Sequence, residues 1–198
     1  MNVMLRRDGA YQPISLGGML LGTEIERAYH ESKLLIDPFD PSCVGPNSYD
    51  IHVGDKILEY NIIGHIDPTD GATYMTRVTE IPKKGIILQP GRLYLVPTKE
   101  KIGSNHYIPM LTGRSSIGRL GISVHQEGGL GDVGYLGNWI LQITTMYPFL
   151  LKPFSRLAQV YFMVPYGALD ETRLYKGKYY NTSSDDLKGS LLYLDPDV

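Results

Sequence analysis

Short runs of alternating apolar and polar residues, separated by turn signals, dominate the chain from residue 49 onward. A period of two predicts β-strands, because successive side chains of a strand point to opposite faces. Gly-Asp, Pro-Gly, Gly-Gly and Tyr-Pro pairs mark the turns. The stretches expected to contain strands are YDIHVGDKILEY (49–60), GIILQP (85–90), RLYLVPTKEKI (92–102), IPMLTG (108–113), GISVHQ (121–126), NWILQITTMY (138–147) and RLAQVYFMV (156–164). Their spacing favours an all-β fold, an antiparallel sandwich or barrel.

One segment, GTEIERAYHESKLLI (22–36), has a helical pattern instead. Thr23 and Glu26 have the spacing of a capping box at the start of a short helix. The helix is expected to end near Ser32, because the next residues alternate apolar positions with Pro-rich turns. Its apolar stripe consists of Ile25, Ala28 and Tyr29.

The 198 residues suit one domain, with residues 1–19 as a loosely held arm, 20–168 as the β domain and 169–198 as a tail. The stretch DETRLYKGKYYNTSSDDLKGS (170–190) is polar and is expected to be mobile. No internal repeat or low-complexity tract indicates a second domain.

Composition narrows the class of protein. A net charge of −2 with interspersed signs argues against nucleic acid and membrane partners. A single cysteine, Cys43, excludes an internal disulfide and argues against a thiolate zinc site. No apolar run resembles a signal peptide or reaches the length of a membrane span, so a soluble cytoplasmic protein is expected.

The strongest local signal is TGRSSIGRLG (112–121), in which two arginines flank two serines among three glycines. Glycine lets backbone N–H groups approach an anion, serine hydroxyls donate to phosphate oxygens, and arginine binds them with a bidentate fork. The segment is not a Walker motif, which needs GxxxxGK[ST]. The pattern predicts phosphate binding; the alternative is an ordinary turn with exposed arginines.

Two further polar residues lie in strand patterns. Asp50, in PNSYDIHV, follows a turn-forming Pro-Asn-Ser and could help to hold a hydrated Mg²⁺, or could only cap the turn. In RLAQV, alternation places Gln159 on the same face as Leu157. Gln159 is either a ligand contact or a satisfied amide of the core or of an interface.

Several chemistries are excluded or disfavoured. His125 has no second His or Cys at metal-ligand spacing. The zinc-deaminase signature, HxE with a later PCxxC, cannot occur with a single cysteine, and no GxSxG nucleophile elbow is present.

In order along the chain, these segments resemble the superfamily of trimeric dUTPases and dCTP deaminases. The resemblance covers roughly residues 20–182. LLIDPFDPSCVGPNSYDIHV, LQPGRLYLVPTKEKI and GRSSIGRLGI are similar to the deaminase branch, GDVGYLGNW resembles the third dUTPase motif, and RLAQV is similar to the fourth. The Gly-rich, Phe-containing fifth motif of dUTPases is not found.

The resemblance implies a distorted antiparallel jelly roll, with a short N-terminal helix, that assembles as a homotrimer with active sites between subunits. It implies deoxyuridine or deoxycytidine triphosphate as ligand and Mg²⁺ as cofactor, with Asp50 helping to position the ion. Asp132, Arg119 and Ser115 are the implied catalytic residues, Asp132 being the base that activates water. The implied substrate-binding residues are Arg114, Ser115, Ser116, Gly118, Arg119, Asp132, Tyr135, Ile140, Leu141, Gln142, Gln159, Lys178 and Tyr179, with the ring of Tyr135 against the deoxyribose and the tail closing over the nucleotide.

The choice of reaction depends on position 142, where the resemblance places the glutamate of deaminases and this chain has Gln142. An amide does not titrate near neutral pH, and a positioned acid or base contributes about 10²–10⁴-fold to proton transfer. The sequence is therefore interpreted as a Mg²⁺-dependent dUTP diphosphatase that releases dUMP and pyrophosphate. The alternatives are a dCTP deaminase, alone or combined with dUTP hydrolysis and with Glu127 as a substitute acid, and a non-catalytic nucleotide-binding regulator. The glycines at 134 and 137 are expected to turn the chain so that Asp132 and Gln142 contact one nucleotide.

Overall fold

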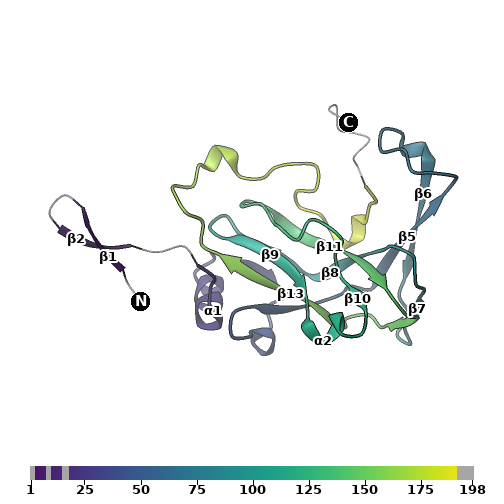
Figure 1. Cartoon of the computed structure of the whole chain (residues 1–198), viewed down its shortest axis with the longest axis horizontal. Helices are drawn as coiled ribbons and strands as arrows, with labels where there is room; N and C mark the ends of the chain where they lie inside the picture. Colours follow the sequence, from purple (N-terminus) through teal and green to yellow (C-terminus); the bar gives the residue numbers. More distant parts are fainter. Residues whose placement is uncertain (1–2, 8–9, 15–17, 191–198) are drawn as a thin grey trace.

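The computed structural model describes residues 3–7, 10–14 and 18–190, and it confirms the all-β architecture (Figure 1). The strands are β1 (Val3–Arg7), β2 (Ala10–Ile14), β3 (Leu35–Asp37), β4 (Tyr49–His52), β5 (Lys56–Ile62), β6 (Tyr74–Glu80), β7 (Ile86–Leu88), β8 (Tyr94–Gly103), β9 (Ile108–Gly113), β10 (Ile122–Ser123), β11 (Leu136–Thr145), β12 (Phe149–Leu151) and β13 (Arg156–Met163). The helices are α1 (Gly22–His30) and α2 (Ser115–Gly118), and 3₁₀ turns lie at Pro41–Cys43, Gly71–Thr73, Glu171–Arg173 and Ser184–Asp186.

Antiparallel pairing organises the strands into two main sheets. The larger has the order β10-β11-β8-β5-β6, with β3 also paired to β8, and the smaller has the order β4-β13-β9. The strands β12 and β7 form a separate pair. One core of buried side chains contains residues from both main sheets, as expected for a sandwich in which each sheet buries one face.

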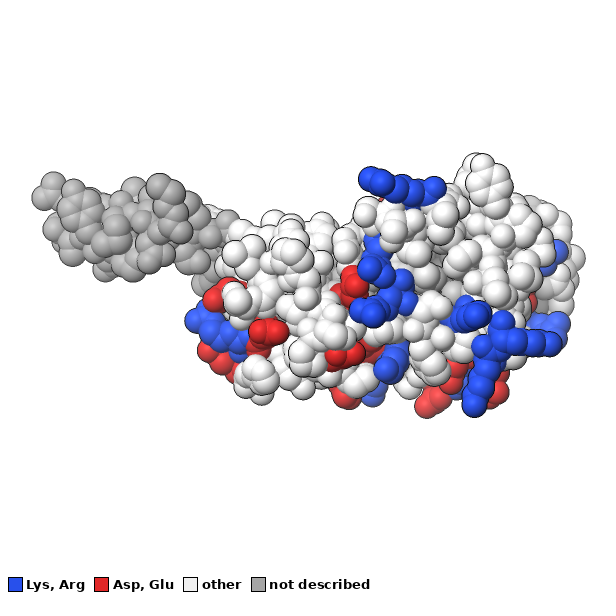
Figure 2. Space-filling model, turned by 90° about the horizontal axis from the view of Figure 1, so that it is seen from below, with Lys and Arg blue, Asp and Glu red and all other residues white. Residues whose placement is uncertain are grey.

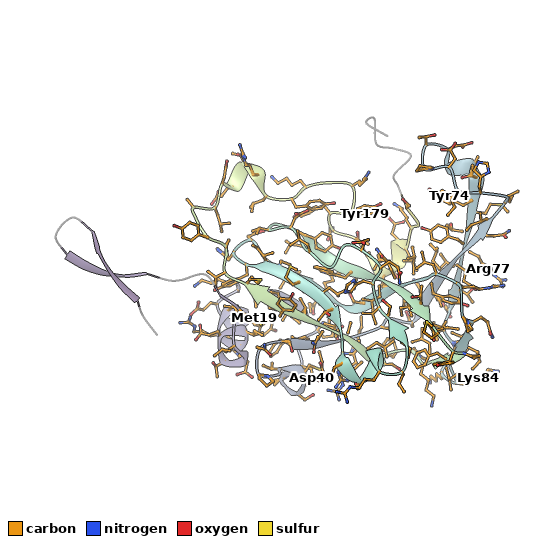
Figure 3. All side chains as sticks on the ribbon, viewed as in Figure 1. Met19, Asp40, Tyr74, Arg77, Lys84 and Tyr179 are labelled. Atoms are coloured by element: carbon orange, nitrogen blue, oxygen red, sulfur yellow. The ribbon has the colours of Figure 1, made fainter. Side chains whose placement is uncertain are left out.

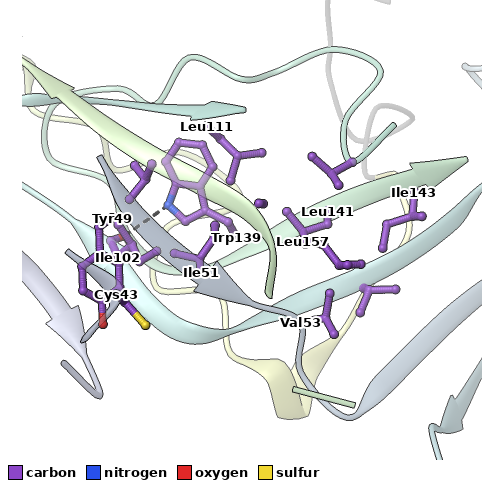
Figure 4. Packing of buried hydrophobic residues seen from close by; sticks show 14 of the residues in the cluster. Cys43, Tyr49, Ile51, Val53, Ile102, Leu111, Trp139, Leu141, Ile143 and Leu157 are labelled. Atoms are coloured by element: carbon purple, nitrogen blue, oxygen red, sulfur yellow. Dashed lines mark hydrogen bonds between the residues drawn. The ribbon is translucent and has the colours of Figure 1, made fainter. Parts of the chain in front are cut away.

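Strand β11 shows how the alternating pattern positions the site. Trp139, Leu141 and Ile143 are buried in the core shown in Figure 4, while Ile140 and Gln142, between them, are only half-buried. The indole N–H of Trp139 donates to the carbonyl of Ile102 at 3.3 Å, which satisfies the polar atom of the largest ring in this cluster. Gln142 therefore lies on the face of β11 that points away from the core.

Helix α1 forms where the apolar stripe predicts it, but the expected capping box is wrong. The helix begins at Gly22 with Leu21 as the N-cap residue, and no side chain caps it. The backbone N–H of Gly22 donates instead to the carbonyl of Pro46 at 2.8 Å, and a Cβ at this glycine would lie 2.4 Å from the carbonyl oxygen of Gly45. Contact with the 45–46 turn therefore fixes the start of α1 one residue before Thr23.

Strand β13 departs from strict alternation. Its pairing with β4 shifts between Arg156 and Ala158, and both Leu157 and Ala158 are buried. This irregularity places Leu157 in the core rather than on the face of Gln159, so the expected pairing of those two residues is wrong. Gln159 remains half-buried.

Other segments differ from the expected pattern. The stretch 49–60 contains two strands, β4 and β5, which belong to different sheets, with a break at 53–55. Strands β1 and β2 pair as a hairpin within the expected arm, and Figure 1 shows this hairpin standing away from the body. The polar segment 170–190 folds back along β11, to which it is hydrogen-bonded.

Candidate functional site

The segment 112–121 forms a single helical turn at the end of β9. Arg114 is the N-cap of α2, and its backbone N–H donates to the carbonyl of Leu157 at 3.1 Å. The side chains that follow, Ser115, Ser116 and Arg119, are exposed, and Gly118 has open space around it. We call residues 114–119 the phosphate loop after the binding that the sequence predicts, since exposed hydroxyls and an exposed guanidinium suit an anion.

The structure brings Asp50 and Gln159 beside the phosphate loop. Nε of Arg114 lies 3.3 Å from Oδ1 of Asp50. Gln159 on β13 is the strand partner of both Asp50 on β4 and Thr112 on β9. Asp50, Thr112 and Gln159, which are up to 109 positions apart in the sequence, are therefore neighbours in the smaller sheet.

The side chains near this loop that could bind a metal ion limit how Mg²⁺ could be held. Among the described residues, no cluster of three or more His, Cys, Asp or Glu side chains is arranged to hold a metal ion. Asp50 is a single carboxylate beside a loop suited to phosphate. A hydrated Mg²⁺ that arrives with a triphosphate needs only one or two carboxylates, so the residues fit an ion that phosphate oxygens help to hold.

A second group of predicted residues lies around Asp132. The backbone N–H of Tyr135 donates to the carbonyl of Asp132 at 3.1 Å and closes a turn before β11. The exposed carboxylate of Asp132 and the ring of Tyr135 line a pocket of about 240 Å³. Its remaining lining residues are Gly128, Leu130, Gly131, Trp139, Ile140, Tyr175, Tyr179 and Thr182.

The phenol of Tyr135 is held firmly. Its hydroxyl donates to the carbonyl of Asn138 at 2.8 Å, and its ring lies 5.7 Å from the ring of Trp139 and 5.8 Å from that of Tyr175. Burial raises the pKa of Tyr135 to about 12, so the phenol is neutral at physiological pH. A neutral, fixed ring next to a carboxylate suits packing against a sugar.

The glycines of this segment accommodate the C-terminal tail. A Cβ at Gly134, whose φ is +98°, would lie 2.6 Å from the backbone nitrogen of Tyr175. A Cβ at Gly137 would lie 2.9 Å from the backbone nitrogen and oxygen of Thr182. The backbone that approaches these glycines is therefore the chain's own tail, and the expected contact of Asp132 and Gln142 with one nucleotide stays a prediction.

Gln142 lines a second pocket, of about 570 Å³, together with Lys178, Tyr179 and other tail residues. Its Oε1 accepts hydrogen bonds from the backbone N–H groups of Gln126 and Glu127, at 3.0 and 3.1 Å. Ile140, Tyr179 and Thr182 line both pockets, so the two hollows adjoin. Asp132 and Gln142 therefore line two adjoining pockets.

Not every predicted contact residue reaches this region. Leu141 is fully buried in the core, and its side chain points away from both pockets. The lining of the two pockets includes no residue of the phosphate loop. Figures 1 and 3 place α2 at the lower edge of the body and the tail with Tyr179 at the upper edge. The predicted site residues therefore form two separate groups in one copy of the chain.

The sequence pattern did not predict two buried polar networks beside the site. Glu100, which is 1% exposed, accepts from Nδ1 of His52 at 2.5 Å and from its backbone N–H at 3.0 Å. Asn138, which is 2% exposed, bonds the backbone of β8 and the tail. The only signal for Asn138 was a polar residue at the start of an apolar strand.

The surface charge agrees with the balanced composition. On the face shown in Figure 2, acidic and basic side chains are interspersed, with no single-sign field. None of the described helices is long and apolar enough to cross a membrane.

Comparisons with known proteins identify relatives of the whole β domain. A family model described as dCTP deaminase-like matches residues 19–164. The chain is 38% identical over 167 residues to a protein of Clostridium beijerinckii named "dCTP deaminase, dUMP-forming", covering 83% of this chain and 91% of the relative. A protein of Cytophaga hutchinsonii with the same name is 37% identical over 164 residues, covering 83% and 91%.

A solved structure gives the same fold. The 2'-deoxycytidine 5'-triphosphate deaminase of Agrobacterium tumefaciens matches with a TM-score of 0.60 at 24% identity, over 79% of this chain and 51% of that one. This likeness supports the jelly-roll architecture expected from the sequence.

These findings overturn the interpretation as a dUTP diphosphatase. The similar proteins are named as dUMP-forming dCTP deaminases, which was the alternative, although Gln142 stands where the resemblance places a glutamate. The interpretation rested on one side chain, Gln142, whereas the similarity to a dUMP-forming enzyme extends over 83% of this chain.

Proposed function

This chain belongs to the dCTP deaminase-like family, and we propose that it converts dCTP to dUMP with release of ammonia and pyrophosphate. Two water molecules are consumed, one at C4 of the ring and one at the α-phosphorus. The observation that carries the proposal is the 38% identity to a dUMP-forming enzyme over more than four-fifths of this chain. The pocket that joins Asp132 to Tyr135 supplies a place for the second step.

For pyrophosphate release, Asp132 takes the proton of the water that attacks the α-phosphorus. Its carboxylate is exposed at the pocket, where water can reach it. Arg114, Ser115 and Arg119 bind the phosphate oxygens and stabilise the charge that develops on them. Ser116 and Gln159 lie next to these groups and add hydrogen bonds.

Mg²⁺, when bound, supplies charge neutralisation on the triphosphate. Asp50 is the residue of this chain that would hold it, together with phosphate oxygens and water. The ion pair with Arg114 keeps the Asp50 carboxylate beside the loop.

For deamination, a titrating group must carry protons between water, N3 and the leaving ammonia, and Gln142 cannot do this. We assign the role to Glu127. Its backbone N–H donates to Oε1 of Gln142 at 3.1 Å, so the Glu127 backbone is fixed next to the residue at the family's acid position. Its side chain is exposed and free to approach a ring from the side of the turn.

The two groups of site residues suit assembly from several copies. In one chain α2 lies at the lower edge of the body in Figure 1, and no residue of the phosphate loop lines the Asp132 pocket. A homotrimer in which the loop of one copy faces the pocket of its neighbour would complete the site. Mixing inactive Arg119→Ala and Asp132→Asn chains tests this arrangement, since mixed trimers contain some intact sites. Recovered turnover supports it, and absence of any recovery in verified mixed trimers refutes it.

The chemical steps are tested by measuring ammonia and pyrophosphate separately with dCTP and with dUTP. Asp132→Asn is expected to lower pyrophosphate release by about 10²–10⁴-fold while ammonia release from dCTP continues. Glu127→Gln is expected to lower ammonia release by a similar factor and to preserve pyrophosphate release from dUTP. Glu80→Gln, at an exposed position on β6, is the matched control. Wild-type protein that releases no ammonia from dCTP would refute the proposed function.

A further inference from the structure

The side-chain amide of Gln142 has a fixed orientation. Two backbone N–H groups, from Gln126 and Glu127, point at the same atom of Gln142 at 3.0 and 3.1 Å. Only an oxygen accepts such bonds, so Oε1 must face the 126–127 turn. The NH₂ group of Gln142 is then directed away from the turn.

Gln142 lines the larger of the two adjoining pockets, where we place the nucleotide base. Ile140 and Tyr179 continue that lining into the pocket of Asp132. No hydrogen bond from Nε2 to a partner occurs within the described part of the chain. The side chain can therefore donate toward a ligand but cannot accept, because its acceptor is already used twice.

We propose that Gln142 is a specificity-determining residue that presents a fixed N–H donor to the pyrimidine edge, and so favours a 4-oxo ring over a 4-amino ring. The 4-oxo group of uracil accepts a hydrogen bond from this donor. The 4-amino group of cytosine is itself a donor, so it leaves both groups unpaired. The inference rests on the proposed function, because it takes the ring edge to lie against Gln142.

This preference has a consequence for the two-step reaction. The uracil nucleotide is both the product of deamination and the reactant of pyrophosphate release. The N–H donor of Gln142 gains a hydrogen-bond partner only when oxygen replaces the 4-amino group. It therefore retains the uracil intermediate for the second step. Gln142 would then act after Glu127 has completed the ring chemistry.

Binding of α,β-imido analogues of dUTP and dCTP, measured by calorimetry, tests the preference without turnover. Wild-type protein is expected to bind the uracil analogue about tenfold more tightly. Gln142→Glu keeps an oxygen for the two backbone donors but replaces the outward donor with an acceptor, so it should reduce the ratio at least about tenfold. Gln126→Ala is the control, since its side chain bonds Thr144 and its backbone N–H to Gln142 remains.

Equal affinity of the wild type for the two analogues, or an unchanged ratio in Gln142→Glu, would overturn the inference. Thermal unfolding of both variants shows whether the turn is intact, because a merely structural role would change the melting temperature and not the ratio. Failure of the proposed function has a different signature. In that case dCTP yields no dUMP, while the uracil preference and its response to Gln142→Glu are still observed.

Discussion

Asn138 joins three parts of the chain next to the site, and its removal makes a quantitative prediction. Its Nδ2 donates to the carbonyls of Thr98 and Glu100 at 2.8 and 3.2 Å, within the irregular part of β8. Its Oδ1 accepts from the backbone N–H of Ser184 in the tail at 3.1 Å. The side chain is almost completely buried, so water cannot replace it without entering the sheet.

The cost of Asn138→Ala follows from these bonds. A buried polar group that loses its partner costs about 1–3 kcal/mol. The carbonyls of Thr98 and Lys99 lose a donor, whereas that of Glu100 keeps the hydroxyl of Thr98 as its donor. Ser184, which is half-buried, can recover a bond from water. The free energy of unfolding should therefore fall by about 2–4 kcal/mol, and the melting temperature by about 6–12 °C. Asn138→Asp should cost more, because a carboxylate would face those carbonyls with no proton to donate.

Urea unfolding at one fixed protein concentration measures this change, since the stability of an oligomer depends on concentration. Asn61→Ala, at an exposed position on β5, should stay within about 0.5 kcal/mol of the wild type. A midpoint for Asn138→Ala within that same margin, or an Asn138→Asp variant more stable than Asn138→Ala, would contradict the reasoning.

Three further predictions concern the tail, the site phenol and the second buried network. Gly137→Ala places a Cβ 2.9 Å from the backbone of Thr182, so it should displace the tail, increase proteolysis near that residue and lower turnover, with the β-sheet circular dichroism unchanged. The pKa of Tyr135 is raised to about 12 from the ordinary value of 10.0, so its contribution to stability is present below pH 10 and is lost as pH rises toward 12. Tyr135→Phe should therefore flatten this part of the curve of stability against pH. An unchanged curve between pH 10 and about 12 would refute the assignment. Glu100→Gln retains one of two acceptors for His52 and should cost about 1–3 kcal/mol in urea unfolding, and a neutral result would count against a buried pair.

The period of two identified the longer strands because each has one face in a core. Strand β11 is the clearest case, with buried and half-buried residues in strict alternation after Asn138. Strand β6 was missed since it is exposed on both faces and has no apolar period to detect. Strands β3 and β12 have three residues each, which is too short for a periodic signal.

The choice of candidate site residues follows from local sequence, whereas their grouping in space does not. Glycine, serine and arginine in one short segment carry the chemistry of phosphate binding within local sequence. The approach of Arg114 to Asp50, and of Thr182 to Gly137, depends on how distant strands and the tail pack. Local sequence carries no information on such contacts, so it does not predict the close approach of the tail to Gly134 and Gly137.

Position 142 shows why residue type alone gave the wrong reaction. The amide does not titrate, and this much follows from the sequence. The sequence does not show that the same amide is bonded to the backbone of Glu127, a residue with an exposed carboxylate. A catalytic proton needs a group within reach of the ring and not a group at one fixed place in the chain. Under the proposed function, the two tasks of the acid would be divided, with proton transfer carried out by Glu127 and recognition of the ring edge by Gln142.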